Sequence, residues 1–265
     1  MGHIRLGRLP ATRPWRQVVE LLVEEAPQSA TAQSVLAAAE PALARAMGLD
    51  LDASEGLADA AKDAGLSYSV WLLTQVLRAA RADDFVGDLG KLGMRMASQP
   101  SIADLTSAFA EAVNQNVQRR TDIGEMARLA TLESLVAVCR PQQRTLYGTG
   151  QGDVQAALRG ASTPDQFARV AEDCFARFTR RFLLYHLSRE LSRHVGPGER
   201  FANMASRRQF DEALDLHCRQ VSRIVREFAG GWYSKANFAG GITPAKARGF
   251  SHVALKKIRS EMQRR

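Results

Sequence analysis

Long hydrophobic runs are missing from this sequence. Its apolar stretches, such as residues 70–73, are far shorter than the roughly 18–20 residues with which a helix crosses a bilayer. The N-terminal residues are basic, but no apolar segment of the kind found in a secretory signal follows them. These absences exclude a membrane-spanning protein, so we expect a cytoplasmic protein with no membrane partner.

Cysteine is scarce, because Cys139, Cys174 and Cys218 are the three examples in 265 residues. Their odd number and wide spacing exclude a disulfide framework and a CxxC metal site. We therefore expect three buried, free thiols on helices.

Familiar catalytic and cofactor motifs are also absent. The sequence contains no Walker loop, no GxGxxG fingerprint, and no HExxH, GxSxG or zinc-finger spacing. It therefore predicts a protein with no cofactor and no metal site, and it favours a function other than catalysis.

Strand patterns are nearly absent, since the one alternating stretch, residues 3–6, is too short to predict a strand. Helix signals recur throughout instead. Ser101 and Asp104 form a capping box, and Thr121, Thr163 and Thr243 stand where helix N-caps are expected. This pattern predicts an all-α fold, a multi-helix bundle of roughly nine to eleven helices, with either one core or two packed helical subdomains.

The expected helices follow from these caps and from the periodicity of apolar residues. They cover residues 14–26, 31–47, 153–159, 163–195, 210–228 and 243–265. Three further helices begin near residues 67, 101 and 121, and a weaker helical pattern covers 84–96. The apolar residues of 210–228 recur in steps of four and three, so this helix is expected to pack against the helix over 163–195.

A cluster of proline and glycine interrupts the helical pattern between residues 141 and 152. It predicts a division of the chain into three parts. Residues 1–140 would form a helical scaffold or partner-docking subdomain, residues 141–162 a connecting segment, and residues 163–265 a basic helical subdomain.

Positive charge is concentrated in the last third of the chain. Residues 161–265 contain 20 Lys and Arg and 10 Asp and Glu, so they account for more than the whole net charge of +8. The excess is sharpest over residues 228–265, where eight basic residues accompany one acid, Glu261. Because a solvated helix face normally mixes both signs, this bias indicates contact with nucleic acid or with another acidic surface. The dominance of Arg over Lys can also reflect a GC-rich, bacterial genome.

Aromatic and basic residues coincide in one segment, residues 230–241, where two Gly pairs bracket three aromatic residues. We expect this segment to form a Gly-flanked loop whose aromatic side chains either stack on bases or fill the end of the bundle. The predicted nucleic-acid-binding residues are those of the loop and the basic tail: Trp232, Tyr233, Lys235, Asn237, Lys246, Arg248, Lys256, Lys257, Arg259, Arg264 and Arg265.

Two Arg-x4-His patterns, Arg181 to His186 and Arg189 to His194, resemble the active-site motif of HEPN ribonucleases. Those are small helical domains, often dimeric, that cleave RNA without a metal ion. The resemblance covers six residues at each place, and Phe182 or Glu190 stands where that family usually has Asn, Asp or His. It implies that arginine would hold the phosphate and that histidine would act as acid or base.

The sequence therefore favours a non-enzymatic helical protein that binds DNA or RNA through phosphates, without sequence specificity. Two alternatives stay open. The protein could be an assembly subunit whose basic surface meets an acidic protein subunit, or it could be a HEPN-like, metal-independent ribonuclease.

Overall fold

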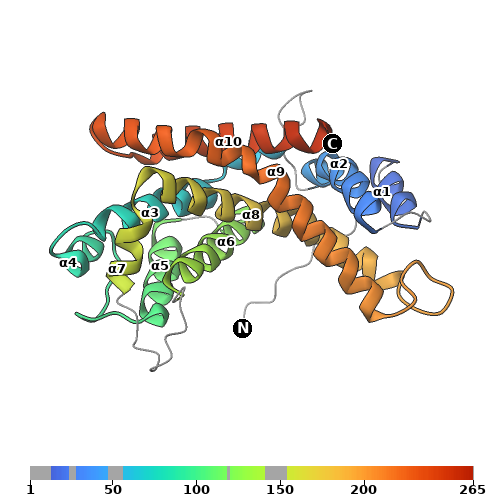
Figure 1. Cartoon of the computed structure of the whole chain (residues 1–265), viewed down its shortest axis with the longest axis horizontal. Coiled ribbons are helices and arrows are strands. Elements are labelled where there is room, and N and C mark those ends of the chain that lie inside the picture. Colours follow the sequence, from blue (N-terminus) through green and yellow to red (C-terminus); the bar gives the residue numbers. More distant parts are fainter. Residues whose placement is uncertain (1–12, 24–27, 47–55, 118–119, 141–153, 265) are drawn as a thin grey trace.

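The computed structural model describes residues 13–23, 28–46, 56–117, 120–140 and 154–264. Within these ranges the chain forms ten α-helices and one 3-10 helix, and it contains an isolated bridge between Val195 and Phe201 but no strand. The predicted all-α multi-helix bundle is confirmed (Figure 1). The alternating residues 3–6 lie outside the described residues.

The helices follow one another in this order: α1 Arg13–Val23, α2 Gln28–Ala46, η1 Gly56–Lys62, α3 Ala64–Ala79, α4 Phe85–Gly90, α5 Ile102–Asn116, α6 Asp122–Cys139, α7 Val154–Ala161, α8 Pro164–Arg193, α9 Met204–Phe238 and α10 Pro244–Arg264.

The predicted caps are present. The side chain of Ser101 accepts a hydrogen bond from the backbone of Asp104, whose carboxylate accepts one from Ser101 in return. The Thr121 and Thr163 side chains cap α6 and α8 by accepting from the backbone of Gly124 and Gln166, and the Thr243 hydroxyl accepts from the Lys246 backbone at the start of α10. These local bonds explain why the helix starts follow the sequence closely.

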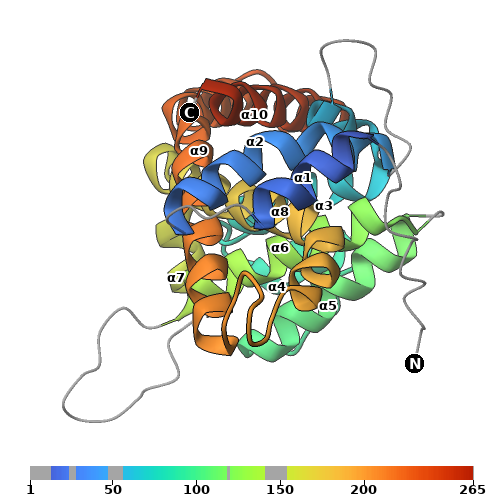
Figure 2. The same ribbon diagram turned by 90° about the vertical axis from the view of Figure 1, so that its right-hand side faces the viewer.

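Helices α8 and α9 make the most extensive contact of any described pair, which confirms their predicted packing. Helix α10 lies along one edge of the molecule and packs on α9, α3, α2 and η1 (Figures 1 and 2). One hydrophobic cluster runs from Trp15 to Met262, so helices on both sides of the predicted 141–162 connection contribute to the same core.

The predicted loop over residues 230–241 is wrong, because α9 continues through Gly230 and Gly231 to Phe238. Gly230 is needed for close packing, since a Cβ there would lie 2.8 Å from the Pro164 carbonyl oxygen at the start of α8. Each glycine has a poor helix propensity, which costs about 1 kcal/mol. Burial of Tyr233 and Ala236 further along the helix offsets this cost. The connection between α9 and α10 is short and includes Gly240 and Gly241, both at positive φ.

Candidate nucleic-acid interface

The two aromatic residues predicted to stack on bases belong to the core instead. Tyr233 is 2% exposed, and its ring stacks on Phe167 with 4.1 Å between the ring centroids. Trp232 is partly buried and stacks on Phe250 at 4.2 Å. Tyr233 joins α9 to α8 and Trp232 joins α9 to α10, so the ring face that meets Phe167 or Phe250 is not open to a base. Asn237 is also partly buried beside them.

Lys246 binds carbonyl oxygens at the end of α9. Its ammonium group donates to the carbonyl oxygens of Ala239 and Gly241, each at 2.7 Å. The C-terminal carbonyls of a helix lack partners within the helix and carry partial negative charge. A lysine from the first turn of α10 therefore neutralises the end of α9 and fixes the turn between the two helices.

Arg259 is likewise held inside the protein. Its Nε donates to Glu40 of α2 at 3.1 Å, and their side chains are only 13% and 2% exposed. The same carboxylate accepts the Leu57 backbone N–H at 2.6 Å. Removing Glu40 from water raises the pKa of its carboxyl, while the charge of Arg259 opposes that rise. Arg259, one of the predicted nucleic-acid-binding residues, thus balances a buried carboxylate within the protein.

The remaining predicted cations lie at the surface. Lys235 is exposed on the last turn of α9, and α10 exposes Arg248, Lys256, Lys257 and Arg264. Lys257 lies 5.7 Å above the ring of Phe228, while Arg264 pairs with Glu261 at 3.0 Å. Arg265 lies outside the described residues.

The exposed cations of α10 share one side of the helix. At about 100° per residue, positions 248, 256, 257 and 264 fall within roughly half of the helix circumference. The opposite side is buried through Ala247, Phe250, Ala254, Leu255 and Ile258. No residue classed as exposed on α10, within its described range, is acidic. We call Lys235, Arg248, Lys256 and Lys257 the basic surface.

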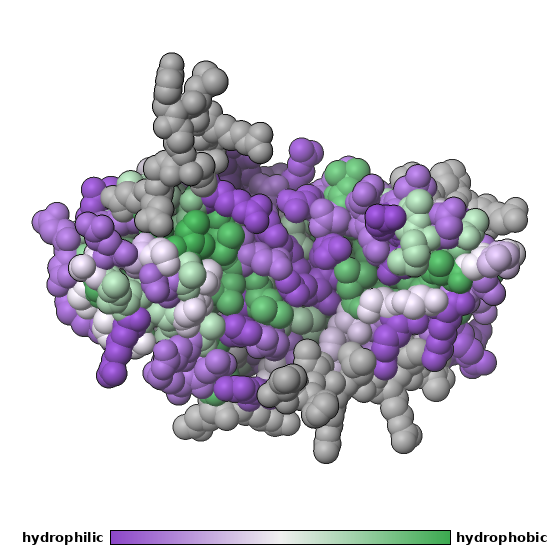
Figure 3. All heavy atoms as spheres, turned by 90° about the horizontal axis from the view of Figure 1, so that it is seen from below, coloured by the Kyte–Doolittle hydropathy of each residue, from purple (hydrophilic) through white to green (hydrophobic). Residues whose placement is uncertain are grey.

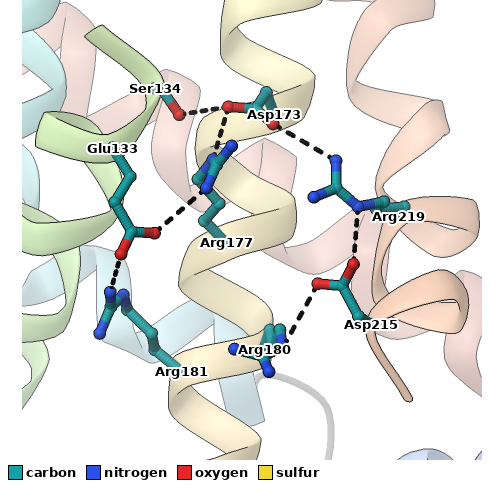
Figure 4. A network of polar contacts seen from close by, with 8 residues as sticks. All are labelled: Glu133, Ser134, Asp173, Arg177, Arg180, Arg181, Asp215 and Arg219. Atoms are coloured by element: carbon teal, nitrogen blue, oxygen red, sulfur yellow. Dashed lines mark hydrogen bonds and ion pairs between the residues drawn. The ribbon is translucent and has the colours of Figure 1, made fainter. Parts of the chain in front are cut away.

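Other arginines of the last third are matched with carboxylates. Asp173 of α8 accepts from Ser134 and Arg177, each at 2.7 Å, and pairs with Arg219 at 3.5 Å. The network joins α6, α8 and α9 and contains Glu133, Ser134, Asp173, Arg177, Arg180, Arg181, Asp215 and Arg219 (Figure 4). These cations hold helices together, in contrast to those of the basic surface.

The Arg-x4-His patterns do not form exposed catalytic pairs. Arg181 pairs with Glu133, and His186 is 2% exposed. Burial and the charge of Arg189 lower the pKa of His186 to about 4, and Arg189 donates to its Nδ1 at 3.0 Å. The Nε2 and Nδ1 atoms of His194 lie 3.6 Å from a Glu190 carboxylate oxygen and 3.5 Å from a Glu199 carboxylate oxygen. Each histidine is thus held by contacts with other side chains of the protein.

The cysteines behave as expected. All three are buried and free, and burial raises the pKa of Cys139 to about 11 and that of Cys174 to about 12. Such thiols are inert as nucleophiles near neutral pH. Among the described residues, no group of three or more His, Cys, Asp or Glu side chains could hold a metal ion.

Phe238 is the third aromatic residue of the 230–241 segment, and it was not among the predicted nucleic-acid-binding residues. It ends α9 and is 95% exposed, more than any other large hydrophobic residue described. The following Gly240-Gly241 pair is a sequence signal for a helix end. That signal places Phe238 on a last helical turn, but it does not reveal which of the three aromatic residues faces solvent.

On the face away from α10, hydrophobic residues lie in patches interrupted by hydrophilic ones (Figure 3). None of the helices in the described parts of the chain is long and apolar enough to cross a membrane. Fold and surface together define an all-α protein with a basic helical surface. Comparison with family models, with curated proteins and with solved structures finds no match.

Proposed function

We propose that this protein binds nucleic acid, DNA or RNA, through phosphates contacted by the basic surface. The observation that carries the proposal is the one-sided charge of α10, whose exposed residues include four cations and no acid. A buried opposite side holds the helix in place, so the cations are presented on a rigid support. A cytoplasmic location belongs to the same proposal.

The contrast with the arginine network supports this choice. Arg177, Arg181 and Arg219 each face a carboxylate within the protein, so their charge is already balanced. Lys235, Arg248 and Lys256 have no ion pair within the described parts of the chain. Charge that the fold does not use is free to balance phosphates, which release their counterions when the protein binds.

The salt dependence of binding tests the proposal. With Lys235, Arg248, Lys256 and Lys257 each on a phosphate, log affinity for duplex DNA should fall with log salt at a slope of about −3.6. Reversing charge in the triple variant Arg248→Glu, Lys256→Glu, Lys257→Glu should flatten that slope to about −1. It should also weaken binding similarly for every sequence, because phosphates carry no base information.

A matched control separates local contact from net charge. The triple variant Arg13→Glu, Arg16→Glu, Arg95→Glu changes the same charge at exposed positions outside α9 and α10. It should keep a slope near that of the natural protein. Equal losses in the two triple variants, or unchanged affinity for both DNA and RNA after the α10 reversal, would refute phosphate binding by the basic surface. The second result would favour an acidic protein partner.

A further inference from the structure

The turn between α9 and α10 holds an exposed aromatic ring on a fixed support. Phe238 occupies the last position of α9, and the next five residues form the turn. Trp71 and Gln75 of α3 both donate to the Ile242 carbonyl oxygen, at 2.9 and 3.1 Å. Lys246 binds the carbonyls on the other side of the turn. The backbone beside Phe238 is therefore anchored from two helices.

The exposure of Phe238 is not explained by packing. The residue is 95% exposed, whereas Tyr233 on the same helix is buried against Phe167 and Trp232 is partly buried against Phe250. An exposed aromatic side chain leaves apolar area in water, which is unfavourable relative to burial. An exposed ring on an anchored backbone is suited to bind a partner that covers it.

Two cations lie close to the end of α9 and the turn that follows it. Lys235 lies three residues before Phe238 on α9, so the two side chains are neighbours on the helix surface. Arg78 of α3 lies at the turn after Phe238, since a Cβ on Gly241 would lie 3.5 Å from its guanidinium group. Both cations are exposed. The charge around Phe238 therefore selects an anionic partner.

We propose that Phe238 stacks on an unpaired base of single-stranded nucleic acid while Lys235 and Arg78 contact the adjoining phosphates. The proposal rests on the proposed function, and it names the class of nucleic acid that this end of the molecule binds. Duplex bases are stacked on one another and hide their faces, whereas single-stranded bases offer them to aromatic rings. The other cations of the basic surface, which lie on α10, would then contact backbone phosphates of either form.

Truncation of the ring tests the proposal, with a fluorescent oligothymidylate and a fluorescent DNA duplex as probes. Phe238→Ala should weaken binding of the single strand by about 5- to 150-fold and change duplex affinity less than about twofold. Phe238→Leu should behave like Phe238→Ala, because leucine is apolar but has no ring to stack. Phe238→Trp should retain single-strand affinity, and its fluorescence should be quenched when the oligonucleotide binds.

Leu216→Ala is the matched control, because Leu216 is an exposed apolar residue of the same helix at 55% exposure. It should leave both affinities unchanged. The inference is overturned if Phe238→Ala leaves single-strand affinity unchanged, if it weakens both probes equally, or if Phe238→Leu binds like the natural protein. Loss of binding to anionic phospholipid vesicles in Phe238→Ala, with single-strand affinity intact, would assign the ring to a membrane surface instead.

The two proposals fail in different ways. If the α10 charge reversal weakens both probes and Phe238→Ala weakens neither, phosphate binding stands and base stacking falls. If the natural protein binds neither probe at low salt, both fall.

Discussion

Arg259 and Glu40, which are 219 positions apart in the sequence, form an ion pair of 3.1 Å in the protein interior. The pair joins α10 to α2, and through the Leu57 backbone it also joins both helices to η1. A charge-assisted hydrogen bond of this kind is strong when both partners are shielded from water. The pair therefore fixes the helix that presents the basic surface.

Arg259→Ala should lower the free energy of unfolding by about 3–5 kcal/mol, because it leaves the Glu40 carboxylate buried without its cation. Arg264→Ala, which removes an exposed partner of Glu261, should cost less than about 1 kcal/mol. Denaturant unfolding of the two variants measures the difference. Similar stability of both would show that the buried pair contributes no more than an exposed one.

The adjacent glycines of α9 should respond in opposite directions to alanine. Gly230→Ala places a Cβ 2.8 Å from the Pro164 carbonyl oxygen and should destabilise the protein by about 1–2 kcal/mol. Gly231→Ala meets nothing within 4 Å and should stabilise it by up to about 1 kcal/mol, through better helix propensity. Thermal unfolding of the two variants, side by side, checks the sign of each change. Stabilisation by Gly230→Ala would contradict the close contact of α8 and α9.

Tyr233→Ala should act on stability and leave base contact intact. The ring is buried against Phe167, so its removal should cost about 3–5 kcal/mol. Affinity for single strands, measured well below the melting temperature, should stay within about twofold of the natural value. Phe238→Ala should show the reverse pattern, with unchanged melting temperature, since its ring is exposed. Single-strand affinity lost in Tyr233→Ala at unchanged stability would contradict the core assignment.

His186 should make stability depend on pH between about 6.5 and 4. Its folded-state pKa of about 4 lies below the ordinary value of 6.5, so the unfolded chain binds the proton more readily in this window. Stability is therefore fully present above about pH 6.5 and is lost as pH falls toward 4, by up to about 3 kcal/mol.

The variant His186→Gln has no such proton site. Carboxylates titrate in both proteins, so the difference in unfolding free energy between them isolates His186. That difference should shrink as pH falls from 6.5 to 4. A difference that stays constant across this window would show that His186 is not held neutral by burial and by Arg189.

Much of the fold can be predicted from short-range patterns in the sequence. Ser101, Thr121 and Thr163 are predicted as helix caps, and each accepts a backbone hydrogen bond from a residue three positions later. The packing of α8 on α9 is likewise predicted by apolar periodicity. The prediction of a loop over 230–241 is wrong because the low helix propensity of glycine is a weak local preference, which the packing of Tyr233 and Ala236 overrides.

Local patterns in the chain are enough to predict that the fold is helical, where most helices begin, and that positive charge gathers in the last third. Caps, periodicity and composition act within a few residues, so they can be recognised without knowing the fold. Which of those charges stay at the surface depends on how the helices pack. Lys246 is taken up by the end of α9 and Arg259 by Glu40, whereas Lys256 and Lys257 remain exposed. The environment of a side chain depends on residues that the fold brings together from distant parts of the chain. Those residues determine whether the charge of the side chain is balanced inside the protein or is left for a partner.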